Sequence, residues 1–314
     1  MKKLLAALAA LVVVSLSFAG AAFAQDTTAE KFSVVATNFP AYDFARQVVG
    51  DSATVTMLLP PGAESHTYEP TPQDILKIQN AGLFLYVGGE SDTWVDGILS
   101  SFDHKAPAVR MIDCVTAVEE VTAPGMQAEE EQEAGSTEIE YDEHVWTAPK
   151  NAIRIEQAIA KELAALDPAN ASAYQANSEA YTQELEALDQ QFMDFFAGVS
   201  NKTLIVGDRF PLRYFADEYG LTYYAAFPGC STETEPSAAT FAFLIDKVKS
   251  VGASTVFYIE FSNHLVADSI AEQTGAKTAL FHSCHNVSQA DLDQGVTYLS
   301  LMAQNLETLR EAMR

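Results

Sequence analysis

Three histidines in this sequence follow predicted strands or lie on loops, where their side chains could meet: His66 in PPGAESHTYEP, His144 in YDEHVW and His282 in LFHSCHN. Neutral imidazole is a preferred ligand of Zn²⁺, which takes four ligands in a tetrahedron. Mn²⁺ is better served by a site with more carboxylate oxygens. A lone loop histidine more often only makes a hydrogen bond, so the interpretation depends on all three meeting. The sequence therefore predicts a metal site made by these histidines, with Zn²⁺ favoured over Mn²⁺.

The fourth position of this predicted site stays open. Asp208 and Glu260 stand near the ends of two predicted strands, and His285 follows His282 by three residues. The side chain of Asp208, Glu260 or His285, or a water molecule, could complete the tetrahedron. His285 could instead orient its neighbour as an outer partner of the ligands.

The cysteines of the chain are Cys114, Cys230 and Cys284. Cys230 and Cys284 both follow predicted strands of the second half, so their loops could meet at one sheet edge. In an exported protein, such a pair could form a disulfide. Direct ligation of the metal by a thiolate is the alternative, and the sequence leaves both open.

Short apolar runs alternate with amphipathic ones, a pattern typical of parallel sheets with helices on both faces. The predicted strands are residues 31–39, 53–60, 83–89, 109–114, 202–208, 221–227, 255–261 and 277–283. Open α/β sheets bind ligands in the crevice beyond the carboxyl ends of their strands. The candidate ligands at or just after such ends are His66, Asp208, Glu260 and His282. By contrast, His104 is expected on the surface and His264 at the start of a helix.

A long helical segment divides the chain into two lobes. Residues 171–196 have aromatic and leucine side chains at helical spacing, and at ~1.5 Å per residue this helix would reach roughly 40 Å. We predict a signal peptide over 1–24, an N-terminal α/β lobe over 25–167, a connecting helix over 168–199 and a C-terminal α/β lobe over 200–314. The acidic segment 124–142 has almost no large apolar side chains, so we expect a surface loop or disordered insert there.

The first 24 residues have the order of a secretory signal. Lys2 and Lys3 precede an apolar run that ends in small residues, with Ala22 and Ala24 spaced as a cleavage site. The run is shorter than the ~20 apolar residues of a membrane span. No cysteine follows that could carry a lipid, so we expect a soluble protein in the periplasm or another extracytoplasmic space. The formal net charge of -25 at pH 7 argues against nucleic acid as a partner, because a polyanion would be repelled.

With these residues in view, essentially the whole mature chain resembles the substrate-binding proteins of zinc and manganese ABC importers (cluster A-I). PPGAESHTYEPTPQDILKIQNAGLFLYVGG resembles the family's first ligand region, with His66 in the ligand place, and DEHVWTAPKNA resembles the second, with His144. GDRFPLRYFADEYGL resembles a third region that usually supplies His or Glu, but Arg209 stands in that place. LFHSCHN presents His282 where Asp or Glu is common. The acidic segment sits where zinc-specific members often carry a histidine-rich loop, and here it has no histidine.

The resemblance implies two α/β lobes joined by one long rigid helix, with a divalent transition metal bound between them. It implies zinc as the transported ligand, the membrane permease of an ABC importer as the partner, and no catalysis. We expect a monomer. The alternatives are an exported zinc-dependent hydrolase, with Asp208 or Glu260 as its base, and a metal-binding surface adhesin. The chain has no H-E-x-x-H motif, which argues against the hydrolase.

Overall fold

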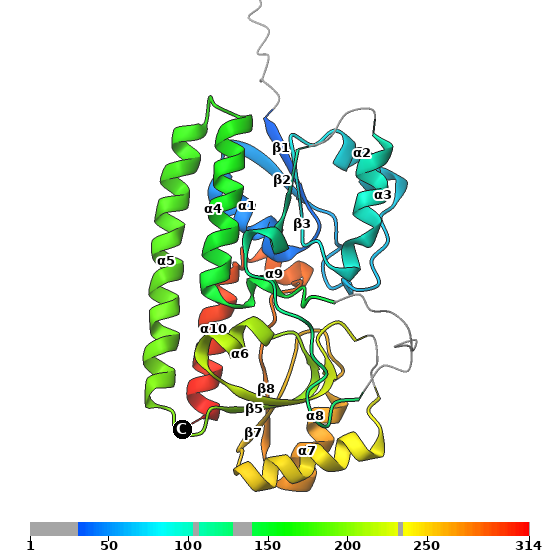
Figure 1. Cartoon of the computed structure of the whole chain (residues 1–314). Helices are drawn as coiled ribbons and strands as arrows, with labels where there is room; N and C mark the ends of the chain where they lie inside the picture. The colour runs from blue at the N-terminus through cyan, green and yellow to red at the C-terminus, as the bar shows by residue number, and fades with distance from the viewer. Residues whose placement is uncertain (1–30, 103–106, 128–139, 232–234, 314) are drawn as a thin grey trace, which may run out of the picture. The chain divides into compact units, whose positions relative to one another are not determined.

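Two parallel four-stranded sheets form the centre of the fold, and helices pack against them (Figure 1). The computed structural model describes residues 31–102, 107–127, 140–231 and 235–313. The predicted signal peptide, His104 and the middle of the acidic segment lie outside these described residues. The predicted fold class, two α/β lobes built on parallel sheets, is confirmed.

The first sheet has the strand order β2-β1-β3-β4, and every neighbouring pair is parallel. Its strands are β1 (Phe32–Ala36), β2 (Ala53–Met57), β3 (Leu83–Tyr86) and β4 (Ala108–Arg110). Its helices are α1 (Phe39–Val49), α2 (Pro72–Gln79) and α3 (Thr93–Ser101). The strand predicted over 31–39 ends early because Asn38 caps α1, its side chain accepting from the N–H of Ala41. Thr71 caps α2 and Pro72 starts it, as the sequence predicts.

The second sheet repeats this architecture with the order β6-β5-β7-β8, again parallel throughout. Its strands are β5 (Thr203–Phe210), β6 (Thr222–Pro228), β7 (Thr255–Tyr258) and β8 (Lys277–Leu280). Its helices are α6 (Arg213–Tyr219), α7 (Ala238–Val251) and α8 (Leu265–Thr274), and the short α9 (Gln289–Asp293) follows β8. Strands β7 and β8 end before Glu260 and His282, so both residues lie on loops beyond the strand ends.

The long helix α5 (Ala171–Gly198) runs beside both sheets, and α4 (Pro149–Leu166) pairs with it beside the first sheet (Figure 1). Helix α5 contacts α1 of the first lobe and α6 of the second, as expected of a connector. The C-terminal helix α10 (Tyr298–Ala312) also contacts α5 and returns to α1. There the N–H of Tyr298 donates to the buried Asp43 carboxylate at 2.7 Å. The connecting helix is therefore accompanied by a second link between the lobes.

The ends of the acidic segment are packed, so the prediction that residues 124–142 do not pack is wrong there. Met126 is buried, and the N–H of Gln127 donates to the carbonyl of Ala226 at 2.8 Å. At the other end, Tyr141 forms an antiparallel bridge with Glu119, and Asp142 is only 2% exposed. Residues 128–139 lie outside the described part of the chain.

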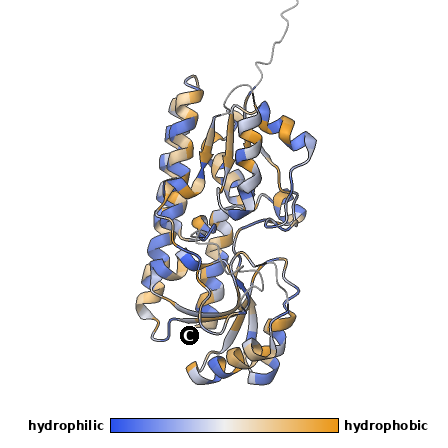
Figure 2. Ribbon diagram, turned by 45° about the vertical axis from the view of Figure 1, so that its right-hand side comes forward, coloured by the Kyte–Doolittle hydropathy of each residue, from blue (hydrophilic) through white to orange (hydrophobic). Residues whose placement is uncertain are grey.

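The interior is apolar in the way that buried parallel sheets require. Figure 2 shows hydrophobic colour along the strands of the first sheet, and β3 is buried over its whole length. The aromatic side chains of Trp146, Tyr174 and Tyr298 are fully buried. Within the described ranges, no helix combines the length and apolarity that crossing a membrane would need.

Candidate metal centre

The loop between β2 and α2 carries His66, and contacts from the other lobe hold this loop. Asn286 donates two hydrogen bonds from Nδ2, to the carbonyl of Pro60 at 2.8 Å and to that of Ala63 at 3.0 Å. Gly62, whose φ of +76° suits glycine, donates its N–H to the carbonyl of Val287. The Nδ1 atom of His66 lies 2.8 Å from Oγ of Ser91. The loop and its imidazole are therefore fixed on both sides.

His144 stands just before a short 3₁₀ helix (Val145–Thr147) that leads into α4. The Asp142 Oδ1 atom accepts from the backbone N–H of His144 at 2.8 Å and lies 2.9 Å from Nδ1 of its ring. Because an ionised carboxylate can only accept, Nδ1 carries the proton and Nε2 keeps its lone pair. The ring is completely buried, yet Nε2 has no hydrogen-bond partner. A carboxylate that orients a histidine with a free nitrogen is a common arrangement around protein-bound metals.

The loop after β8 brings His285 to the same place. The Glu260 carboxylate organises this loop, accepting from the N–H groups of Ser283 at 2.7 Å and His285 at 3.1 Å. Cys284 lies between them in the left-handed region, with φ of +63°. The His285 ring packs edge-on against Trp146, with ring centroids 4.9 Å apart.

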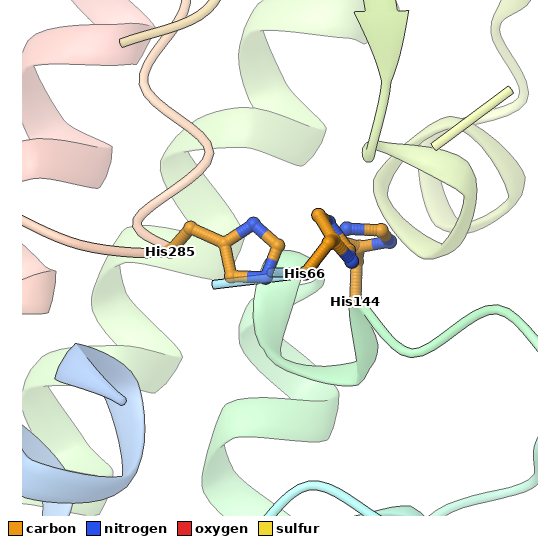
Figure 3. A group of neighbouring side chains, drawn as sticks. All are labelled: His66, His144 and His285. Carbon is orange, nitrogen blue, oxygen red and sulfur yellow. The ribbon is translucent and has the colours of Figure 1, made fainter. Parts of the chain in front are cut away.

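The three imidazoles of His66, His144 and His285 lie together, as Figure 3 shows. One ring nitrogen from each lies within 4.8 Å of the others, and the ring centroids are 4.8 to 5.6 Å apart. His66 comes from the first lobe, His285 from the second, and His144 from the loop that precedes α4. Three nitrogen donors at this spacing could hold one Zn²⁺ ion, since zinc draws its ligands in to ~2.0 to 2.1 Å.

Of the three histidines predicted from the sequence, the structure brings His66 and His144 together but not His282. In place of His282, the side chain of His285, three residues later, lies with them. The Nδ1 atom of His282 accepts from the N–H of Cys284 at 2.9 Å, so its ring is turned back onto its own loop. Asn305 holds the same residue by its N–H and its carbonyl. His282 thus serves the shape of the loop that presents His285.

The carboxylates considered for the fourth position also lie elsewhere. Glu260 is occupied by the backbone of the His285 loop, as described above. Asp208 accepts from the N–H of Arg209 at 2.8 Å, and its burial raises the pKa of its carboxyl group. Neither residue belongs to a group of potential ligands among the described residues. His264, expected at a helix start, occupies the N-cap position of α8 and is exposed, so that prediction is confirmed.

Burial and mutual repulsion keep two of the three imidazoles neutral. Burial, with the neighbouring His144 acting in the same direction, lowers the pKa of His66 to about 3. Burial also lowers the pKa of His285 well below its usual value, with His144 and His66 acting in the same direction. Burial opposes the charging of His144 too, but Asp142 outweighs it and raises the pKa of that ring. His66 and His285 are therefore ready to bind a cation near neutral pH, whereas the Asp142 carboxylate also favours the protonated form of His144, which must lose its Nε2 proton before that nitrogen can bind an ion.

A second group of possible ligands shares His66 and consists of His66, Glu143 and Cys230. Glu143 is buried, and its Oε1 atom accepts from the N–H of Ser91 at 2.6 Å. Cys230 lies on the loop after β6 and is a free thiol, as is Cys284. The hypothesis of a disulfide between these cysteines is therefore wrong for this structure. Cys284 is instead buried in the main core beside its own loop.

Arg209, at the position where the resemblance leads one to expect a ligand, makes a contact between the lobes. Its guanidinium lies 2.9 Å from Oε2 of Glu64, two residues before His66. It also donates to the carbonyl of Ser231 at 3.3 Å. The three imidazoles could therefore bind a cation through their nitrogen lone pairs, while the position of Arg209 supplies a guanidinium and not a negatively charged ligand.

The sequence matches a family model described as the periplasmic zinc-uptake complex component A, ZnuA, over residues 34–312. The zinc-binding lipoprotein AdcA of Streptococcus pneumoniae is 32% identical over 311 residues, which cover 98% of this chain and 60% of that protein. The high-affinity zinc uptake system protein ZnuA of Bacillus subtilis is 31% identical, covering 92% of this chain and 89% of that one. This chain thus spans only 60% of the length of the pneumococcal relative.

Solved structures of metal-binding proteins have a similar fold. The Zn(II)-bound ZnuA-like domain of S. pneumoniae AdcA has a TM-score of 0.74 at 28% identity, covering 90% of this chain and 99% of that domain. The laminin-binding protein Lmb of Streptococcus agalactiae, described as bifunctional with adhesin and metal-transporting activity, has a TM-score of 0.76 at 28% identity. It is covered completely, and 90% of this chain is matched.

Proposed function

Because the chain belongs to the ZnuA family of zinc-uptake components, we propose that it captures Zn²⁺ between its lobes and delivers it to the membrane permease of an ABC importer. The ion is cargo, and the protein performs no chemistry on it. In this proposal the chain is exported by its first 24 residues and acts as a monomer outside the cytoplasmic membrane. We keep the predicted division at residues 25–167, 168–199 and 200–314 as part of it.

The observation that carries the proposal is the meeting of His66, His144 and His285, contributed by both lobes. His144 is held by Asp142 so that a buried nitrogen without a partner is left for the ion. Three neutral nitrogen donors favour zinc over manganese, which prefers oxygen-rich sites. Ligands taken from two lobes also join the lobes when the ion binds, so capture and release are coupled to their separation.

Metal content of single variants tests this assignment. The metal-free protein is loaded with Zn²⁺, freed of excess ion and analysed for zinc, and its affinity is measured by calorimetric titration. We expect His66→Ala, His144→Ala and His285→Ala each to lose most of the bound zinc. His264→Ala, a change of an exposed histidine just before α8, is the matched control and should bind as the unchanged protein does.

His282→Ala distinguishes the two sets of histidines. We expect it to keep one zinc per chain, since its ring faces its own loop. Loss of zinc in His282→Ala together with full retention in His285→Ala would contradict the site proposed here. Titration with Mn²⁺ under the same conditions should give weaker binding than Zn²⁺.

A further inference from the structure

The three-histidine group leaves one corner of a zinc tetrahedron unassigned, and two side chains compete for it. Glu143 and Cys230 both lie within 4.8 Å of a nitrogen of His66. A carboxylate oxygen and a thiolate sulfur are both good zinc ligands, at ~2.0 to 2.2 Å and ~2.3 Å respectively. The choice between them depends on what each side chain already does.

Glu143 is held in another role. Its Oε1 atom accepts the N–H of Ser91 at 2.6 Å, and its side chain lies against Gly89 so closely that a Cβ there would be 2.2 Å from Cγ. The other oxygen, Oε2, lies 3.9 Å from Nδ1 of His66. Glu143 therefore supports the His66 ring from a fixed position, and moving it to an ion would cost the hydrogen bond to Ser91.

Cys230 lies on a loop that is built to pass beside the histidines. Gly229 precedes it, and a Cβ at Gly229 would lie 3.0 Å from Cε1 of His144 and 3.0 Å from the carbonyl oxygen of Phe210. The absence of a side chain at Gly229 thus brings this loop against the His144 ring. The thiol that follows lies near His66, so the loop reaches two of the three imidazoles. Cys230 is anchored through its backbone, whose N–H donates to Glu120 at 3.0 Å, and its thiol also hydrogen-bonds that carboxylate, a bond that an ion would replace.

We propose that Cys230 is the fourth ligand of the ion, completing a site of three imidazole nitrogens and one thiolate sulfur. This inference rests on the proposed function and adds to it a donor from the loop that follows β6 in the second lobe. On binding, the S–H bond is replaced by a bond from sulfur to the metal, and the proton leaves to solvent. A thiolate donor makes the site favourable to zinc and to softer ions such as Cd²⁺. It also disfavours Mn²⁺.

Cobalt and cadmium report the thiolate directly. Co²⁺ or Cd²⁺ alone is added to the reduced, metal-free protein, and thiolate-to-metal charge-transfer absorption is measured in the near ultraviolet. We expect the band in the unchanged protein and in Cys114→Ser, which removes a free cysteine that belongs to neither group of potential ligands among the described residues. Cys230→Ser should lose the band. Cys230→Ser should still bind Zn²⁺, but with an affinity at least about tenfold lower. Losing an outer partner of a metal ligand already costs about tenfold or more, and losing a direct ligand should cost no less.

The outcomes separate this inference from the function on which it rests. Metal binding without a thiolate band, or a band that survives in Cys230→Ser, would overturn the role of Cys230 and leave zinc capture standing. If Glu143→Gln lowers zinc affinity far more than Cys230→Ser does, the fourth ligand is Glu143 and the proposal is wrong. Absence of any zinc binding to the unchanged protein would instead refute the function. Thermal unfolding of each variant without metal shows that the fold is retained.

Discussion

The Nδ1 atom of His144 lies 2.9 Å from Oδ1 of Asp142, and the backbone N–H of His144 donates to the same oxygen at 2.8 Å. This double contact sets both the tautomer and the direction of a completely buried imidazole. It leaves Nε2 as a lone-pair donor with no partner in the protein. Asp142 therefore influences how strongly His144 can bind an ion, although Asp142 itself is not one of the three proposed ligands.

Asp142→Asn should therefore weaken zinc binding without touching the ion. The amide cannot stabilise Nδ1–H as a carboxylate does, and it can rotate to present a donor. We expect a loss of about tenfold in affinity, within the range known for outer partners of metal ligands. Calorimetric titration measures it, and Asp113→Asn, at a largely exposed carboxylate, is the matched control. An unchanged dissociation constant in Asp142→Asn would contradict the role assigned to Asp142.

The pH dependence of binding should come mainly from one imidazole. The pKa of His66 is lowered to about 3, and that of His285 well below 6.5, so both rings are neutral at pH 6.5 and above. The pKa of His144 is raised above 6.5, so this ring is increasingly protonated as the pH falls through that raised value. Zinc must displace that proton, and affinity falls as the pH is lowered.

Titration of Cys230→Ser, which removes any proton released from the thiol, isolates this effect. As the pH is lowered, zinc affinity should begin to fall while the pH is still above 6.5, because the pKa of His144 is raised above that value. Below that pKa, the affinity should decline by about tenfold per pH unit, the slope for one proton. Adding Asp142→Asn to this variant should move the decline to lower pH, since the carboxylate is what raises the pKa. A slope of two or three protons would mean that His66 and His285 also titrate, contrary to this expectation.

The positions of two of the three histidines could be predicted because regular elements fix them. The alternation of apolar and amphipathic segments defines the two sheets, and the strand-end rule then directs His66 to the crevice. His144 follows from its place just before a long helix. The strands themselves are apolar over several consecutive residues, which makes their identity readable from sequence alone.

The third histidine could not be chosen in this way. Strand β8 ends at Leu280, and His282 and His285 both lie on the irregular loop that follows. The direction of each ring depends on Glu260 and on the left-handed turn at Cys284, neither of which has a periodic signal. The HSCH spacing was the one hint that His285 could be a ligand. Asp142 was missed because its acidic surroundings indicate solvent, whereas the fold buries it.

The contact of Arg209 with Glu64 should affect release of the ion more than the fold. The pair joins the second lobe to the loop of His66, but the Glu64 side chain is 39% exposed, so solvent weakens the attraction. In a cycle of Arg209→Met, Glu64→Gln and the double variant, we expect a coupling of about 0.5 kcal/mol. Stopped-flow measurement with a zinc chelator should show dissociation about twofold faster in each single variant, by the same energy. Additive effects in the double variant would show that the two side chains act independently.

Glu156 offers a test of stability that is independent of metal. It lies on α4, is completely buried, and accepts from Thr182 of α5 at 3.3 Å, while its Oε1 atom has no partner. Burial raises the pKa of this carboxyl from 4.5 to about 7. A carboxyl group with a raised pKa in the folded state costs nothing below the unfolded value and destabilises the protein progressively as the pH rises from about 4.5 to 7.

Glu156→Gln removes the ionisable group and keeps the shape of the side chain. At pH 8 it should raise the free energy of unfolding by between about 1 and 3 kcal/mol, the upper figure being the full cost of such a shift. Near pH 4.5, where the glutamic acid is still protonated in the folded protein, the same change should have little effect. Denaturant unfolding of the metal-free protein at both pH values measures this, with Glu179→Gln at an exposed position of α5 as control. A stabilisation of equal size at both pH values would contradict this expectation, because it would show that ionisation of Glu156 does not destabilise the folded protein.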